Sequence, residues 1–136
     1  MITAVDTSAI LAIFKQEQDA EAWLLRLATA AQSGPLVISE VVFAELAACF
    51  VRADDLQRRL ESLAIELLPS SKATLFAAGQ IFAAYRQTGG ARTTMVPDFL
   101  IGAHALTQAN QLASADRGYL RSYFGSLPLI TAKATQ

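Results

Sequence analysis

The chain has 136 residues, 53% of them hydrophobic, and its 11 Lys and Arg against 12 Asp and Glu give a formal net charge of −1. These values predict a single domain over residues 1–136 with one buried core, and the charge balance excludes the strongly basic signature of a non-specific nucleic-acid binder. One cysteine, Cys49, excludes an internal disulfide and a cysteine-rich zinc site and fits a cytoplasmic protein, and no apolar run is long enough to span a membrane.

Short apolar runs alternate with helical patterns along the whole chain. Capping residues, apolar periodicity and Gly or Pro breaks predict the following elements in order: strand 2–5, helix 9–14, helix 19–31, strand 36–38, helix 41–51, helix 53–66, strand 67–68, helix 72–89, helix 97–110, strand 112–115, helix 117–124 and strand 127–131. This alternation predicts an α/β fold of three layers, in which helices flank a central parallel sheet of about four to five short strands.

Three acids are predicted to meet at one edge of this sheet. Asp6 and Asp116 each follow a predicted strand directly, and Asp98 lies in the first turn of the helix that begins at Pro97. Parallel strands end at the same edge, and the helices that follow them start there. Taken singly, each acid is better explained as a helix cap or dipole partner. Three carboxylates at one edge repel one another unless a cation is present, so their convergence predicts a divalent metal ion.

Glu45 is the fourth candidate acid. Its neighbours at helical spacing are all apolar: Val41, Val42, Ala48 and Cys49. A carboxylate on an apolar face is unfavourable unless it is paired or bound to a metal. Glu40 is the competitor, but it lies in the first turn of the same helix, where the helix dipole accounts for it without a function. We therefore favour Glu45 as the residue that completes the site.

Four carboxylates and no cluster of His or Cys select a hard cation, Mg²⁺ or Mn²⁺, rather than zinc. Such ions activate water and stabilise the leaving oxygen when a phosphodiester is hydrolysed. Ser8 and Ser114 are candidates for orienting the ligand carboxylates from the second shell, although capping or strand-end hydrogen bonds explain each equally well. Thr7 is a weaker candidate for the same role.

Four segments together resemble the acidic motifs of the PIN-domain family, and their spacing resembles its VapC-like toxin branch: AVDTSAIL, SEVVFAEL, VPDFLIGAHAL and SADRGYL. The resemblance implies a PIN-like fold and a Mg²⁺- or Mn²⁺-dependent endoribonuclease. It also implies a homodimer and a cognate antitoxin whose C-terminal segment enters the active-site groove. By motif, the family's acids fall on Asp6, Glu45, Asp98 and Asp116, with Asp6 and Asp98 as direct metal ligands. Gly102 stands where the family often has alanine, a difference that affects packing rather than chemistry.

Two other functions compete with this interpretation. The first is a catalytically silent PIN-like module that binds RNA or protein without cleaving it; the intact set of four acids argues against it. The second is a phosphoacceptor receiver domain, which also gathers acids at a sheet edge. Receivers place adjacent acids after the first strand, whereas this chain has only Asp6 there.

Overall fold

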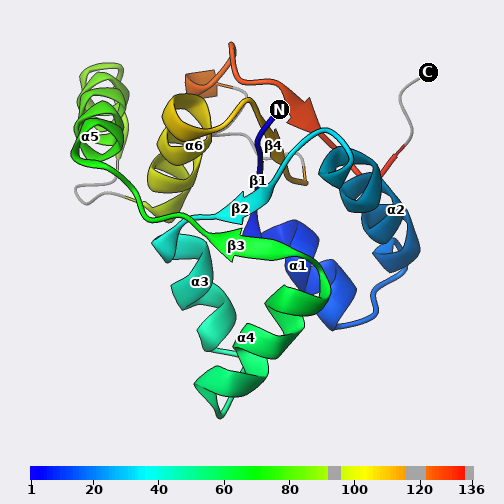
Figure 1. Cartoon of the computed structure of the whole chain (residues 1–136). Helices are drawn as coiled ribbons and strands as arrows, with labels where there is room; N and C mark the ends of the chain where they lie inside the picture. The colour runs from blue at the N-terminus through cyan, green and yellow to red at the C-terminus, as the bar shows by residue number, and fades with distance from the viewer. Residues whose placement is uncertain (92–95, 116–121, 134–136) are drawn as a thin grey trace.

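The computed structural model describes residues 1–91, 96–115 and 122–133. The elements, shown in Figure 1, are β1 (Thr3–Val5), α1 (Thr7–Phe14), α2 (Ala20–Ala31), β2 (Leu36–Ile38), α3 (Glu40–Ala47), α4 (Ala53–Ser62), β3 (Ile65–Leu67), α5 (Lys72–Gln87), α6 (Pro97–Gln108), β4 (Gln111–Ala113) and β5 (Leu129–Ile130). No helix in these ranges is both long enough and apolar enough to cross a membrane.

The sheet is parallel throughout, with strand order β3-β2-β1-β4-β5. The first strand of the chain is therefore the central one, and Ala4 pairs with Val37 on one side and Leu112 on the other. Every residue of β1 and β2 is buried, as expected for parallel strands that are covered on both faces. The predicted α/β class and parallel sheet are confirmed.

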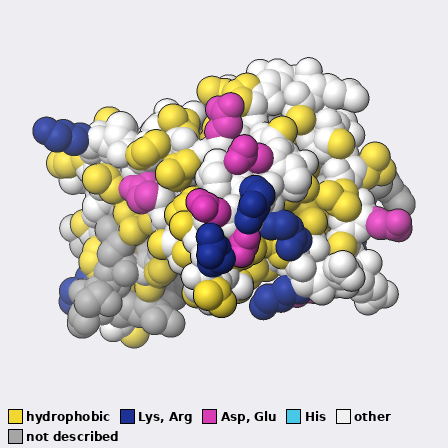
Figure 2. Space-filling model, turned by 60° about the horizontal axis from the view of Figure 1, so that its bottom comes forward, with side chains coloured by type: hydrophobic (Ala, Val, Ile, Leu, Met, Phe, Trp, Pro, Cys, Tyr) yellow, Lys and Arg dark blue, Asp and Glu magenta, His cyan; other side chains and the backbone are white. Residues whose placement is uncertain are grey.

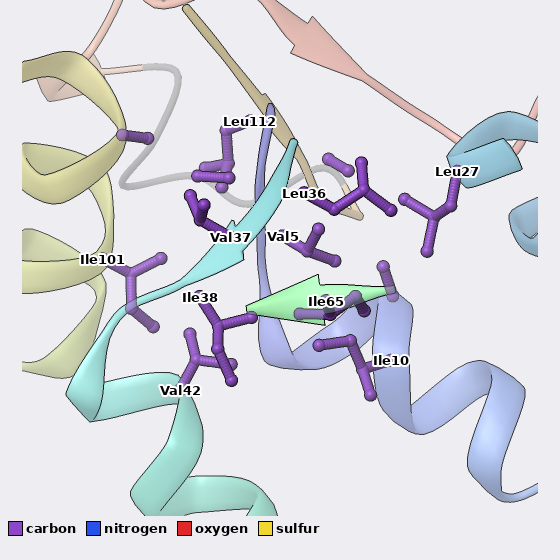
Figure 3. Packing of buried hydrophobic residues seen from close by; sticks show 14 of the residues in the cluster. Val5, Ile10, Leu27, Leu36, Val37, Ile38, Val42, Ile65, Ile101 and Leu112 are labelled. Atoms are coloured by element: carbon purple, nitrogen blue, oxygen red, sulfur yellow. The ribbon is translucent and has the colours of Figure 1, made fainter. Parts of the chain in front are cut away.

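Helices cover both faces of the sheet and make three layers (Figure 1). On one side α1 packs with α2, and on the other α6 lies against β1 and β4 with α5 outside it. Figure 3 shows side chains entering the core from both sides: Leu27 of α2 lies beside Leu36, whereas Ile101 of α6 lies near Ile38. Helix α3 lies at the carboxyl edge of the sheet, where it contacts both α1 and α6.

Helices α5 and α6 each end two residues earlier than the sequence predicts, and α3 and α4 each end four residues earlier. Helix α3 ends at Ala47 rather than near residue 51, and α4 ends at Ser62 rather than at 66. Helix α4 buries Leu56 and Leu60, but the chain then turns at Ala64, whose φ is +56°, so that Ile65 enters the sheet beside Leu36. The strand expected at 67–68 therefore begins two residues earlier. The helix predicted over 117–124 falls mostly outside the described residues.

The start of α6 is fixed by aromatic packing. The ring of Phe99, which is fully buried, lies 5.3 Å from the ring of Tyr85 and 5.7 Å from that of Tyr123. One turn further, a Cβ atom on Gly102 would lie 2.5 Å from the buried ring of Phe124. Glycine at 102 thus lets the C-terminal segment pack closely on α6.

Candidate active site

Asp6 stands at the carboxyl end of the central strand and is 1% exposed. Its amide donates to the carbonyl of Ala113 at 2.9 Å, which continues the pairing of β1 with β4. Its Oδ2 accepts hydrogen bonds from the hydroxyls of Ser8 and Ser114, each at 2.8 Å. Although Asp6 occupies the N-cap position of α1, its side chain makes no capping bond to that helix. The carboxylate is therefore held by side-chain hydroxyls, which a buried carboxylate requires.

Ser8 and Ser114 join three parts of the chain around this carboxylate. Ser8 Oγ also accepts from the amide of Ala115 at 3.2 Å. Ser114 is fully buried, its amide donates to Ile130 of β5 at 3.0 Å, and its hydroxyl lies 2.8 Å from the Ala115 carbonyl as well as from Asp6. A hydrogen bond to a charged group contributes about 1.5–3 kcal/mol, so these contacts both stabilise and orient Asp6. That the two serines act from the second shell of a metal site stays a prediction.

Glu45 is joined to the same place through Thr7. The hydroxyl of Thr7, the buried first residue of α1, donates to Glu45 Oε1 at 2.6 Å. Because Thr7 directly follows Asp6, this bond brings the carboxylate of α3 to the end of β1. Within the described residues, Asp6 and Glu45 are thus linked through neighbouring positions of the chain.

The reasoning that favoured Glu45 from the sequence is wrong about its surroundings. Helix α3 buries only Val42 and Leu46 and ends at Ala47. Its outer side and the residues just beyond its end are exposed, and they include Glu45, Ala48 and Cys49. Glu45 is therefore not on an apolar face. It is joined to the sheet edge by its hydrogen bond with the Thr7 hydroxyl.

Glu40, the competing glutamate, is engaged elsewhere. Its Oε1 accepts from the amide of Ser70 at 2.9 Å and from the Ser70 hydroxyl at 2.8 Å. Partial burial raises the pKa of the Glu40 carboxyl, but these hydrogen bonds and the nearby His104 outweigh it, so the pKa lies below its ordinary value of 4.5. Glu40 binds the loop that follows β3 rather than the end of β1.

Asp98 is the partly buried second residue of α6. The position of this helix follows from its other end, where the amide of Asn110 donates to the Ile2 carbonyl at 2.8 Å and Asn110 Oδ1 accepts from the Ile2 amide at 2.6 Å. Ile2 begins the central strand, so α6 ends at the amino edge of the sheet. Its 12 residues span about 18 Å, which puts Asp98 at the carboxyl edge, where Asp6 lies.

Asp116 lies outside the described residues. Among residues 1–91, 96–115 and 122–133, no three His, Cys, Asp or Glu side chains are close enough together to hold a metal ion, so the three described acids Asp6, Glu45 and Asp98 do not by themselves form a metal-binding cluster. The described donors near Asp6 are carboxylate and hydroxyl oxygens, which suit Mg²⁺ or Mn²⁺. His104 is buried, and its Nε2 lies 2.7 Å from the Leu68 carbonyl, in the loop that Glu40 binds.

The contact of Thr7 with Glu45 is not predicted from the sequence. Thr7 follows the first acid directly, but on the sequence alone it is a weaker candidate than Ser8 and Ser114. The partner of Thr7 lies 38 residues further along the chain. Nothing in the spacing of a single sequence pairs these two positions, so the structure was needed to connect them.

The comparisons with known proteins agree with this architecture. The sequence model of the PIN domain matches residues 3–124, and no curated protein sequence matches the chain. The fold is similar to that of chains in the VapBC2 complex of Rickettsia felis bound to promoter DNA (TM-score 0.75, 20% identity, 96% of this chain and 98% of that one) and VapBC-1 of nontypeable Haemophilus influenzae (0.73, 20%, 97% and 98%). A toxin-antitoxin complex from Klebsiella pneumoniae also contains a similar chain (0.60, 19%, 98% and 99%). Because the match covers almost all of its length, the chain belongs to the PIN-domain family.

Proposed function

We propose that this protein is a metal-dependent endoribonuclease, the VapC-like toxin of a toxin-antitoxin pair. Membership of the PIN-domain family supports the proposal, as does the likeness to chains of VapBC and toxin-antitoxin complexes. The observation that carries it is the buried Asp6 carboxylate, held by Ser8 and Ser114 at the carboxyl edge, with Glu45 joined to the neighbouring Thr7. Ligands of α/β proteins bind at this edge.

In this proposal Asp6, Glu45, Asp98 and Asp116 hold Mg²⁺ or Mn²⁺, with Asp6 and Asp98 as direct ligands. When bound, the ion supplies a Lewis acid and an activated water for hydrolysis of an RNA phosphodiester. The hydroxyls of Ser8 and Ser114 orient the Asp6 carboxylate, as residues outside the ligand shell commonly do.

The proposal is tested by RNA cleavage with Mn²⁺ or Mg²⁺, against EDTA as the control. We expect Asp98→Asn to abolish nearly all metal-dependent cleavage, because it removes a ligand charge. In EDTA this variant should melt at the parent's temperature or higher, because one carboxylate fewer relieves repulsion at the empty site. Added Mn²⁺ should stabilise the parent more than the variant.

Two results would contradict the proposal. Unchanged cleavage by a folded Asp98→Asn variant, in a preparation free of other nucleases, would exclude Asp98 from the chemistry. If instead the parent binds RNA in the presence of Mn²⁺ but never cleaves it, the chain is a catalytically silent PIN-like binding module.

We also propose a cognate antitoxin as the partner that inhibits the enzyme. Helix α1 lies between α2 and α3 and contacts both of them. A cavity of about 280 Å³ opens at the junction of α1 with the end of α3; it is lined by Leu11, Phe14, Lys15, Cys49, Phe50 and Arg59. Figure 2 shows charges of both signs among hydrophobic side chains on the face that carries α4. Such a surface suits an amphipathic segment.

The antitoxin should extend an Arg or Lys from this surface toward Asp6 and Asp98 and compete with the metal ion. We therefore expect the apparent Mn²⁺ affinity of the toxin to fall when the antitoxin is added, as measured by titration calorimetry. An antitoxin variant with Ala in place of that basic residue is the control, and it should bind without changing the Mn²⁺ affinity. Inhibition that leaves the Mn²⁺ affinity unchanged would exclude this mechanism.

The resemblance also leads us to propose a homodimer that acts in the cytoplasm, where its RNA substrate and antitoxin partner are found. Helix α5 packs on α6 and leaves Leu75 and Phe76 46% and 70% exposed. Contiguous exposed apolar surface marks interaction sites, whereas single exposed side chains do not. The outer face of α5, where these two neighbouring side chains are exposed, is the surface we propose for contact with a second copy.

A further inference from the structure

The two glutamates of α3 each accept hydrogen bonds from a hydroxyl residue, but the two partners hold them at different places. Glu40 is bound by Ser70, in the loop after β3. Glu45 is bound by Thr7, at the start of α1. Positions five residues apart on an α-helix point in different directions, so α3 already presents the two acids to different neighbours. The Thr7 hydroxyl is the group that binds the Glu45 carboxylate beside the end of β1.

Thr7 is suited to hold a side chain in one place. It is 6% exposed and lies in the first turn of α1, between Asp6 and Ser8. A β-branched side chain in a helix has few χ1 rotamers, so the direction of its hydroxyl is largely set by the backbone. Glu45, by contrast, is exposed and has a flexible side chain. Fixing such a side chain costs up to about 2 kcal/mol of rotamer entropy.

We propose that Thr7 is a positioning residue of the metal site: its hydroxyl holds the Glu45 carboxylate at the carboxyl end of β1. This inference rests on the function proposed above and extends it by naming the group that holds the Glu45 carboxylate at the end of β1. Thr7 acts through Glu45 and touches neither the metal ion nor the RNA.

The proposal predicts a strong dependence on one hydroxyl. Asp6 is buried and accepts from two serines, so the loss of either leaves a second donor in place. Glu45 has Thr7 as the hydroxyl that draws it from solvent to the sheet edge. Without that hydroxyl we expect the Glu45 carboxylate to spread over several rotamers. Loss of such an outer partner typically lowers metal affinity or activity about 10–100-fold.

The test compares Thr7→Val, which keeps the shape and removes the hydroxyl, with Thr7→Ser, which keeps the hydroxyl. We expect Thr7→Val to weaken Mn²⁺ binding by about 10–100-fold in titration calorimetry, with a matching loss of RNA cleavage. Thr7→Ser should restore both values to near those of the parent. A purely structural Thr7 would instead change the melting temperature in EDTA and leave the Mn²⁺ affinity as it is.

A double-mutant cycle with Glu45→Gln then shows through which residue Thr7 acts. If Thr7 acts through Glu45, adding Thr7→Val to Glu45→Gln causes no further loss of Mn²⁺ affinity, whereas independent effects add. Should Thr7→Val fail to fold, Thr7→Ala replaces it, because it also removes the hydroxyl and leaves Glu45 unchanged; it should weaken Mn²⁺ binding in the same way.

The outcomes separate this inference from the proposed function. If Glu45→Gln weakens Mn²⁺ binding but Thr7→Val does not, or if the two losses add, Thr7 is not a positioning residue and the metal site stands. Equal losses in Thr7→Ser and Thr7→Val would also overturn the inference. If neither Glu45→Gln nor Asp98→Asn changes Mn²⁺ binding or cleavage, the metal site itself is wrong.

Discussion

Two regions of the molecule use hydrogen bonds from polar side chains for different ends. At the carboxyl end of β1, the hydroxyls of Thr7, Ser8 and Ser114 converge on the carboxylates of Asp6 and Glu45. Hydroxyls are neutral donors, so they orient these acids without neutralising them. This region brings the two carboxylates to one edge of the sheet and orients them.

The loop between β3 and α5, residues 68–71, shows the opposite use. Its backbone groups are bound one by one by side chains of α3 and α6: the Leu68 carbonyl by His104, the Pro69 carbonyl by Gln108, the Ser70 amide by Glu40 and the Ser71 amide by Gln108. These contacts hold a loop against two helices. Substitutions in the first region should therefore lower the rate of RNA cleavage, whereas substitutions around the loop should lower the free energy of unfolding.

The largest difference between the two regions is expected when one glutamate in each is replaced by glutamine. Glu45→Gln removes a proposed metal ligand, and we expect RNA cleavage to fall by about 100-fold or more, at or beyond the upper end of the range for outer-shell partners. Glu40→Gln removes a charge of the same kind from the same helix and should leave cleavage near the parent rate. Initial rates with Mn²⁺ measure both. Equal losses in the two variants would remove the distinction between the regions.

Thr74→Val should show the reverse pattern. Thr74 is fully buried, and its hydroxyl contacts Ser71, Thr107 and Gln108 between α5 and α6. Valine leaves those partners unsatisfied, so we expect a loss of about 1–3 kcal/mol in the free energy of unfolding. Urea denaturation measures it, and Thr29→Val, at an exposed threonine of α2, is the control. The rate of RNA cleavage per folded molecule should stay unchanged. A large loss of cleavage would contradict the assignment of this region to stability alone.

The smallest expected effect is on pH dependence. Burial keeps the pKa of His104 below its ordinary value of 6.5, although the Leu68 carbonyl and Glu40 act in the other direction. As the pH falls through 6.5, the unfolded chain therefore binds a proton before the folded one does, and stability decreases until the folded pKa is reached.

His104→Gln should remove this part of the pH dependence, because glutamine does not titrate. Melting temperatures of parent and variant between pH 7.5 and 5, a window above the titration of Glu40, test the expectation. A parent that melts at the same temperature throughout this window would show that the buried His104 contributes no pH dependence.

The sequence predicts the sheet better than the site. A short apolar run followed by an acid could be predicted closely as β1 and Asp6. Helix α1 begins at Thr7 rather than at residue 9, with Asp6 at the N-cap position, so Thr7 and Ser8 are helical residues and not its caps. The end of α4 could not be predicted, because the helical spacing of Leu56 and Leu60 continues to Ala64. Only the pairing of Ile65 with β2 shows where the strand begins.

Site contacts are harder to predict because they join residues far apart. Asp6 could be placed at the sheet edge from topology alone. Its serine partners were candidates, but capping explained them equally well, and the structure shows that Ser8 and Ser114 donate to its carboxylate instead. Glu45 was chosen because its helical neighbours are apolar, but in the structure it is exposed and does not lie on the face of α3 that buries Val42 and Leu46. The hydroxyl of Thr7 connects Glu45 to the site, and the two residues lie 38 positions apart. The spacing of apolar residues in the sequence cannot predict a contact of this kind.

The central position of the first strand has a consequence for synthesis of the protein. The bond that joins Ser114 to Asp6 spans 108 residues, and translation adds about 5–20 residues per second, so roughly 5–20 s pass between the two residues. Until then β1 lacks its neighbour β4, and Asp6 lacks the hydroxyl of Ser114. A nascent or prematurely terminated chain that stops before β4 therefore carries an incomplete centre. A centre that contains Ser114 forms only after β4 has been synthesised.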